Sequence, residues 1–254
     1  AAGKGLPDWH TEKGLAILGI RFYRVLAGFV VGAGLACAGV ILQALLRNPL
    51  AEPYVLGVSS GSGLGAALAI LAGFTGWGLV SVPLSAFLCG CATLVVVYFL
   101  ASHGGKPSIY GLILSGVIVS AVCSSVLMFL VSISSMEGMH NILWWLLGNL
   151  DIDSPPLLAL CAILIVGGCA AANFLSLELN AVTVGHEMAH HMGVRTNAVV
   201  ILGLILATLI TASAVALAGL IGFVGLIVPH ALRTLVGPDH RRLLPASALA
   251  GGAF

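Results

Sequence analysis

The sequence predicts an all-α protein built as a polytopic membrane helix bundle, and its composition is the first reason. Of its 254 residues, 59% are hydrophobic and only 7% are charged, and the mean hydropathy is +1.13. A soluble domain carries about 25% charged residues, so we expect the lipid bilayer to solvate much of this surface. The net charge of +1 argues against nucleic acid as a partner. The second reason is that the charged residues separate long uncharged runs.

These runs predict seven complete spans and an eighth that is cut short. They are residues 25–46, 53–102, 107–136, 154–177 and 196–232. A bilayer core needs about 20 apolar residues per helix, so the second run holds two spans, separated by the glycine-rich residues 73–78. The last run, 37 residues long, is too long for one span, and Gly219–Gly225 divide it into two, the second one short. Residues 243–254 begin the eighth span.

The positions of Lys and Arg predict which loops face the cytoplasm. Alternating the spans gathers six basic residues on one side, namely Arg47, Lys106, Arg195, Arg233, Arg241 and Arg242. The loops expected on the other side, around residues 74–78, 134–153 and 217–222, contain none. We therefore expect the cytoplasmic loops to be residues 47–53, 102–107, 178–195 and 236–242. Residues 1–23 form a periplasmic segment in this scheme, although their basic residues run against it.

Small residues repeat every four positions in two of the expected spans. The repeats are Gly28, Gly32 and Ala36, and Gly57, Gly61 and Gly65. Small residues at this spacing let helix backbones approach closely in a membrane, so we expect a compact bundle. The six cysteines lie in apolar runs and form no C-x-x-C pair, which predicts no metal site from them.

One polar string, His186-Glu187-Met188-Ala189-His190, fits the H-E-x-x-H pattern of zinc metalloproteases. The two histidines would share one face of a helix. A catalytic zinc also needs a third protein ligand, and the only acidic residue after Glu187 is Asp239, in a predicted turn. A membrane-embedded zinc metalloprotease is therefore the alternative interpretation, and we expect no bound metal.

The sequence shows neither an ionisable pathway through its spans nor a nucleotide-binding pattern. Its spans hold almost no ionisable side chains, which argues against an ion-driven mechanism. The nucleotide-binding pattern G-x-x-x-x-G-K-[ST] is absent. We therefore expect no cofactor on this chain, and any ATP and Mg to be bound by another subunit.

Three strings of the sequence resemble the FecCD family of ABC transporter permeases. The first runs from Gln43 to Gly61, the second is Trp145–Gly148, and the third runs from Ala218 to Arg233 and continues as Gly237–Pro245. The residues that carry the family motifs are Gln43, Arg47, Asn48, Pro49, Pro53, Gly57, Gly61, Gly219, Gly222, Gly225, Pro229, His230 and Arg233.

The resemblance implies a function in import. Members of this family are membrane subunits of importers for iron-siderophores, haem and vitamin B12. It implies a single permease domain over residues 1–254, a type II importer fold, and a homodimer in the bacterial inner membrane. Two cytoplasmic ATPases and a periplasmic binding protein would be its partners, and it would work by alternating access. The family usually has ten spans, and the first and last of them are not visible in this chain.

The resemblance also implies that residues 178–195 couple the permease to the ATPase. The matching positions are Gly185, His186, Glu187, Ala189, His190 and Gly193. We expect a short helix from Gly185 to Met192, ended by Gly193. His186 and His190 stand where the family usually has an acid and an arginine. Three histidines here would make the ATPase contact sensitive to pH near neutrality.

The pathway itself is less marked in the sequence. Small hydroxyl side chains could line a cavity, namely Ser59, Ser60, Ser62, Ser115, Ser120, Ser124 and Ser125. Alternatively, they are small residues at helix crossings. The substrate stays open at this point, because importers of siderophores, haem, cobalamin and oxyanions share these motifs.

Overall fold

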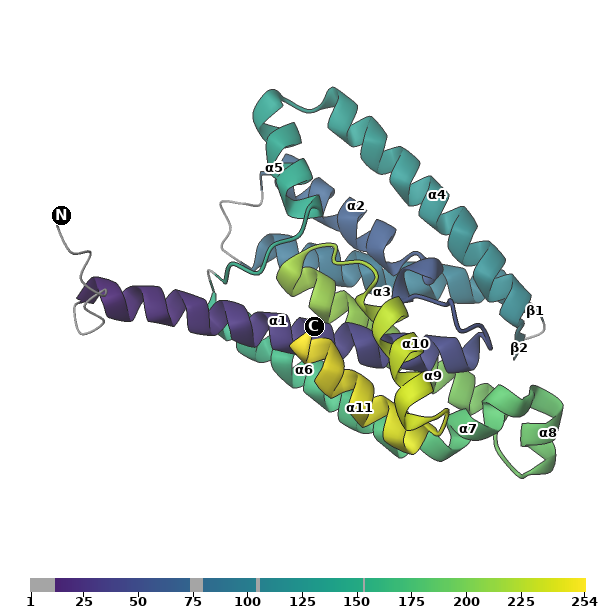
Figure 1. Ribbon diagram of the computed structural model, residues 1–254. Coiled ribbons are helices and arrows are strands. Elements are labelled where there is room, and N and C mark those ends of the chain that lie inside the picture. Colours follow the sequence, from purple (N-terminus) through teal and green to yellow (C-terminus); the bar gives the residue numbers. More distant parts are fainter. Residues whose placement is uncertain (1–11, 74–79, 104–105, 153) are drawn as a thin grey trace.

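The computed structural model describes residues 12–73, 80–103, 106–152 and 154–254, and it confirms an all-α bundle (Figure 1). Within these ranges the only extended pairing is a two-residue antiparallel ladder. It joins β1 (Ser102–His103) to β2 (Lys106–Pro107), with Ser102 opposite Pro107.

Five helices are long and apolar enough to cross a membrane, and they correspond to five of the seven expected spans. They are α1 (Glu12–Leu45), α3 (Ser81–Ala101), α4 (Ile109–Ile133), α6 (Pro155–Phe174) and α9 (Thr196–Ala218). Helix α1 begins well before residue 25. Residues 12–23 of the expected N-terminal segment therefore form its first turns, and residues 1–11 lie outside the described residues.

The other two expected spans are half-length helices. Helix α2 (Val58–Leu71) has 14 residues and α10 (Val224–Val236) has 13. At about 1.5 Å per residue, each covers about 20 Å of a ~30 Å bilayer core. The expectation of a short second half of run 196–232 is confirmed, whereas α2 is shorter than the sequence suggested. Helix α11 (His240–Ala253) contains the expected eighth span, and its first three residues belong to the loop expected at 236–242.

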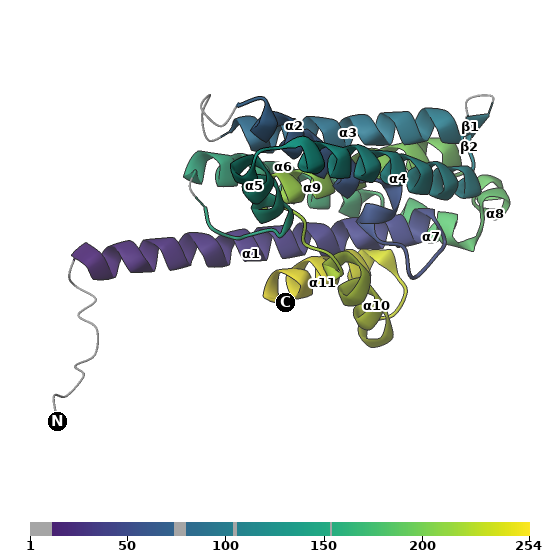
Figure 2. The same cartoon turned by 90° about the horizontal axis from the view of Figure 1, so that it is seen from above.

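The connections gather at two ends of the bundle. Figures 1 and 2 place β1, β2, α7 (Ser176–Val184) and α8 (His186–His191) at one end, called the α8 end here, and α5 (Met136–Leu146) at the other. This division agrees with the alternation of spans. Residues 74–78, expected at the α5 end, lie outside the described residues.

Helix α1 is the centre of the packing, and small residues make its contacts close. It packs against α6, α9, α10 and α11. A Cβ atom on Gly32 would overlap the carbonyl of Gly251 in α11, and one on Gly39 would overlap Gly225 in α10. In the second repeat, a Cβ on Gly61 would overlap the side chain of Thr93 in α3. The predicted close helix crossings are therefore confirmed.

Helix α4 differs from the others because it lies on the outside of the bundle (Figure 1). Only 6% of its most apolar stretch is buried, compared with 72% for α1 and 67% for α9. Its N-terminus is capped by Ser108, which accepts a hydrogen bond from the backbone of Gly111. An apolar helix with so little buried surface needs lipid or another protein to cover it.

Candidate functional site

The predicted helix at the α8 end is present. Helix α8 spans His186–His191 and follows Gly185, whose φ is +137°. At its C-terminus Gly193 has φ +82° and donates to the carbonyl of His190 at 2.9 Å. Val194 donates to the carbonyl of Ala189 at 3.0 Å. Both glycines occupy backbone conformations that other residues rarely adopt, so they define where this helix begins and ends.

Helix α8 is anchored on one side and open on the other. Ala189 is fully buried, whereas Glu187, His190 and His191 are exposed. The side chain of His186 lies outside the described residues. Beside the helix is an open groove of about 490 Å³. Its lining consists of Arg47, Val184, Gly185, Glu187, Met188 and His191. The exposed groups make this a polar surface with both signs of charge.

The zinc interpretation gains no support from this geometry. Helix α8 has only six residues, and Glu187 and His190 are exposed on the surface. Among the described residues, no three His, Cys, Asp or Glu side chains come together where they could hold a metal ion. A catalytic zinc needs three protein ligands and a sheltered open position.

Beyond Gly219 the backbone leaves α9 and runs back into the bundle before α10 begins. Gly219 and Phe223 both have positive φ, +73° and +67°. The Tyr54 hydroxyl donates to the carbonyl of Ile221 at 2.7 Å and accepts from its N–H at 3.0 Å. The Glu52 carboxylate accepts from the N–H of Phe223 at 2.8 Å. Side chains therefore satisfy backbone groups that no helix satisfies here.

This contact corrects one expectation from the sequence. Residues 47–53 and 217–222 were expected in loops on opposite sides of the membrane, yet Glu52 and Tyr54 bond directly to Ile221 and Phe223. The reason is that α2 and α10 are each too short to span. The unwound chain before each helix enters the bundle, and the two unwound segments meet there.

A second set of motif residues holds α10 against α1. Gln43 is buried, with 3% of its surface exposed. Its amide nitrogen Nε2 lies 3.5 Å from the carbonyl of Gly225, and its Oε1 accepts from Arg233 Nη2 at 3.0 Å. Pro229 is buried inside α10, and His230 is exposed. The bonds of Gln43 to Gly225 and Arg233 therefore hold α10 against α1, and His230 takes part in neither bond.

The remaining motif residues shape the turn between α1 and α2. Arg47 has φ +48°, and Asn48 accepts at its Oδ1 from the N–H of Leu50 at 3.0 Å. Pro53 opens the short 3-10 helix Pro53–Leu56, and Gly57 follows it with φ +80°. Pro49 in this turn is exposed, as is Gly222 in the segment before α10. The turn is therefore a compact unit with its own hydrogen bonds.

The structure divides the serines into two groups. Ser124 Oγ lies 3.5 Å from Ser60 Oγ, so α4 and α2 bring hydroxyls together on exposed or half-buried surface. Ser59 and Ser120 are half-buried, and Ser125 is exposed and donates to the carbonyl of Ala121.

Two other serines are at helix crossings. Ser62 is fully buried, and its Oγ lies where a Cβ on Gly90 would overlap it. Ser115 donates to the carbonyls of Gly111, at 2.6 Å, and Val97, at 3.1 Å. Packing between helices encloses both Ser62 and Ser115, which favours for these two the alternative of small residues at helix crossings.

A cavity of about 340 Å³ opens at the α5 end, which the sequence did not predict. Its polar lining includes His140, Trp144 and Asp151. The rings of His140 and Trp144 are stacked with centroids 5.9 Å apart. Asp151 forms an exposed ion pair with Arg24 of α1. Aromatic rings at this end are typical of a membrane interface.

Sequence reasoning missed several residues that the structure brings together. Glu52 and Tyr54 lie in the string from Gln43 to Gly61, and the sequence predicts no role for either of them. A carboxylate and a phenol in an otherwise apolar stretch were a usable signal, because polar groups at membrane depth are costly. Asn180, which donates to Asp239 at 2.8 Å, gave no such signal, and neither did Asp239, because both lie in polar connections.

Comparison with known proteins places the chain in a family. The model of the FecCD transport family matches residues 7–254. The chain is 41% identical to the cobalamin import system permease protein of Halobacterium salinarum, covering 96% of this chain and 65% of that protein. It is 36% identical to the hemin transport system permease protein of Yersinia pestis, covering 97% and 75%. It is also 36% identical to the molybdate import system permease protein of Haemophilus influenzae, covering 94% and 70%.

A solved structure agrees with the fold. The chain superposes on a metal-chelate type ABC transporter in an inward-facing conformation with a TM-score of 0.89 and 34% identity, over 96% of this chain and 77% of the other. The chain thus spans about two thirds to three quarters of the length of these relatives. Because the family match is nearly continuous and the fold agrees with it, the chain belongs to the FecCD transport family and has the helix bundle of an ABC importer permease.

Proposed function

We propose that this protein is the membrane-spanning permease subunit of an ATP-driven importer for a metal chelate. It works as a homodimer in the bacterial inner membrane, with two cytoplasmic ATPases that bind ATP and Mg and with a periplasmic binding protein. The observation that carries the proposal is α8, a short helix anchored by the buried Ala189 and presenting Glu187, His190 and His191 outward. Such a helix offers a docking surface at one end of the bundle.

The contact between the half-length helices supports alternating access. Hinges in transporters absorb motion where helices are interrupted. Here α2 and α10 both begin inside the bundle, and a few polar bonds from Glu52 and Tyr54 join the unwound segments. We assign the change of access to movements about these two breaks.

The exposed face of α4 supports a second copy as partner. This helix is the least buried of the long helices described, and its serines, unlike a lipid-facing surface, offer hydroxyl groups. We place Ser60, Ser120 and Ser124 on a water-filled pathway between two copies. Their weakly binding hydroxyls suit a substrate that passes without being chelated.

The relatives narrow the substrate class. Two are named for cobalamin and hemin, and the superposed transporter is of metal-chelate type. A third is named for molybdate. We favour a metal chelate, because cobalamin has the most similar of these three relatives.

The test uses the complete protein, reconstituted in liposomes with its ATPase and binding protein. We expect ATP-dependent uptake of labelled cyanocobalamin or haemin. Uptake of molybdate alone would contradict a metal chelate as the substrate but would still support an importer. An absence of any ATPase that co-purifies with the protein, or zinc bound in stoichiometric amount and lost in His186→Ala, would contradict the permease itself.

A further inference from the structure

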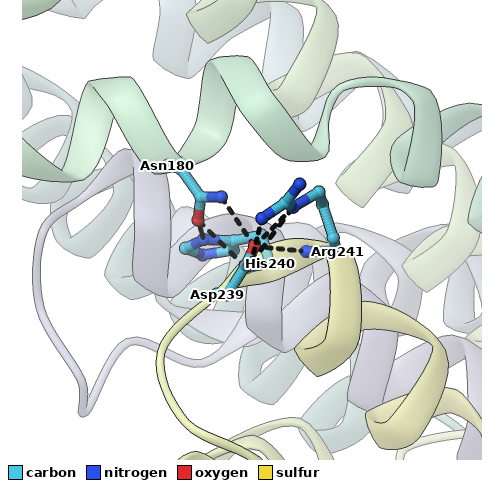
Figure 3. A network of polar contacts seen from close by, with 4 residues as sticks. All are labelled: Asn180, Asp239, His240 and Arg241. Atoms are coloured by element: carbon cyan, nitrogen blue, oxygen red, sulfur yellow. Dashed lines mark hydrogen bonds and ion pairs between the residues drawn. The ribbon is translucent and has the colours of Figure 1, made fainter.

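A single asparagine joins the element before α8 to the turn between α10 and α11 (Figure 3). Asn180 lies on α7, and its Nδ2 donates to Asp239 Oδ1 at 2.8 Å. Its Oδ1 accepts from the backbone N–H of His240 at 3.0 Å and lies 2.6 Å from His240 Nδ1. The Asn180 amide therefore makes three polar contacts with the turn, one through its nitrogen and two through its oxygen.

The chemistry of His240 fixes the direction of these bonds. The side chain is 3% exposed, and its pKa is lowered from 6.5 to about 4 by burial and by the charge of Arg233, against the opposing charge of Asp239. The ring is thus neutral at pH 7. Because Asn180 Oδ1 only accepts, His240 Nδ1 carries the proton and donates. His240 Nε2 has no hydrogen-bond partner among the described residues.

Asp239 is held equally firmly on the other side. Arg241 contacts its two carboxylate oxygens, with Nη2 2.7 Å from Oδ2, and the Arg241 backbone N–H caps α11 on Oδ1 at 3.1 Å. These bonds from Arg241, together with the one from Asn180, hold the pKa of Asp239 well below its ordinary value. The acceptor that Asn180 uses is therefore charged and rigidly placed.

This contact lies between the α7–α8 segment, where the ATPase is proposed to dock, and the turn that follows α10. Helix α7 runs directly into α8 through Gly185, and the turn around Asp239 follows α10. Helix α10 is tied to α1 through the bond from Arg233 to Gln43. Asn180 thus bonds to the turn that directly continues α10 along the chain, and the N-terminus of α10 lies at the break.

We propose that Asn180 is a positioning residue that transmits a displacement of α7 and α8 to α10 and α11 during transport. The proposal rests on the proposed function, because it needs an ATPase that moves α8. The physical reason is that apolar contacts allow helices to slide, whereas three directional bonds hold α7 and the turn at one relative position. A push on α8 then moves α10 together with α7.

The test substitutes Asn180→Asp in the complete transporter. The new carboxylate still accepts from His240, but it cannot donate to Asp239 and repels it. We expect the ATPase rate to stay within about twofold and the substrate transported per ATP to fall by about tenfold, a usual size for coupling between sites. The substrate is labelled cyanocobalamin, or haemin or molybdate where the unsubstituted protein takes up that compound.

Reversal of the bond provides the decisive comparison. In the double variant Asn180→Asp with Asp239→Asn, the amide at 239 donates to the carboxylate at 180, so we expect transport per ATP to return to within about threefold of the parent. Asp239→Asn alone keeps an acceptor for Asn180 and should couple normally. Asn173→Asp is the matched control, because Asn173 is exposed at the end of α6.

The outcomes separate the two proposals. A double variant that transports no better per ATP than Asn180→Asp would overturn the role of Asn180, as would normal coupling in Asn180→Asp. If Asn180→Asp fails to assemble, the double variant and Asp239→Asn test the role of Asn180 in its place. Loss of coupling in either of these two variants, once assembled, would overturn that role. The unsubstituted protein tests the proposed function alone, since absence of ATP-driven uptake there contradicts the importer and not the geometry of the contact.

Discussion

At the scale of single residues, Glu52 and Tyr54 satisfy backbone groups that the start of α10 leaves without helical partners. The bonds reach Ile221 and Phe223, which are 167 and 171 positions away from them in the sequence. An unsatisfied N–H away from water is costly, so these two side chains hold an irregular segment in place inside an apolar bundle.

Replacing Glu52 should separate hydrogen bonding from charge. Glu52→Leu removes the acceptor of the Phe223 N–H, and we expect a loss of about 1.5 kcal/mol of unfolding free energy. Glu52→Gln keeps an oxygen acceptor and should lose much less. The measurement is the midpoint of thermal unfolding in detergent for both variants. Equal losses in the two would show that the charge, and not the bond, stabilises this segment.

His240 predicts how stability depends on pH. The unfolded chain takes up a proton near pH 6.5, whereas the folded one does so only near pH 4. The folded state therefore binds fewer protons between these values, and stability is complete above about 6.5 and falls as the pH drops towards 4. The free energy of unfolding that His240 removes over this pH range is up to about 3 kcal/mol.

The measurement for His240 compares unfolding midpoints of the parent and of His240→Gln between pH 4.5 and 7.5, taking about 4 and 6.5 as the two titration points. The variant lacks this titration, so we expect a shallower pH profile for it over that range. Parallel profiles for the two proteins would show that His240 is not the group responsible.

At the scale of elements, glycines decide which helices lie close. Gly39 in α1 has the backbone of Gly225 where its Cβ would be, whereas Gly167 in α6 has nothing within 4 Å. We expect Gly39→Ala to destabilise the protein by about 1–3 kcal/mol, because the two backbones must separate. Gly167→Ala should be neutral or slightly stabilising. Thermal unfolding of both variants checks this, and a stable Gly39→Ala protein would disprove the close crossing.

The long helices could be predicted from the sequence, whereas the half-length ones could only partly be. Charges bound the runs that become α4 and α6, and charges at one end with glycine-rich breaks at the other bound α3 and α9, all within a few residues. The start of α2 carries no charge, and only Pro53 and Gly57 mark it. The short α8 was predictable, because Gly185 and Gly193 delimit it.

The contacts at the candidate site could not be predicted in the same way. Asn180 and Asp239 are 59 positions apart, and nothing in either local sequence names the other. The serines show the same limit, since Ser60 and Ser62 differ in burial only because they face different neighbours. Pairing across a bundle depends on helix rotation, which composition does not determine.

At the scale of the whole molecule, the outer position of α4 predicts its environment in the assembled transporter. If it lines a water-filled pathway, a cysteine at Ser124 should react with a membrane-impermeant maleimide. A cysteine at Ile163, which is 70% exposed on α6, should face lipid and react at least about tenfold more slowly. The test needs a background in which the six native cysteines are replaced. Equal, slow labelling at both positions would place α4 in lipid or in a sealed interface.

The half-length helices also have a consequence for how the protein is made. A segment of 13 or 14 apolar residues is too short to be threaded into a bilayer as an independent span. Helix α10 also depends on Glu52 and Gln43, which are synthesised 171 and 182 residues before the groups to which they bond. Its insertion must therefore wait until α1 and the following turn are already in the membrane. The order of synthesis, N-terminal half first, presents α10 with a finished binding surface as it leaves the ribosome.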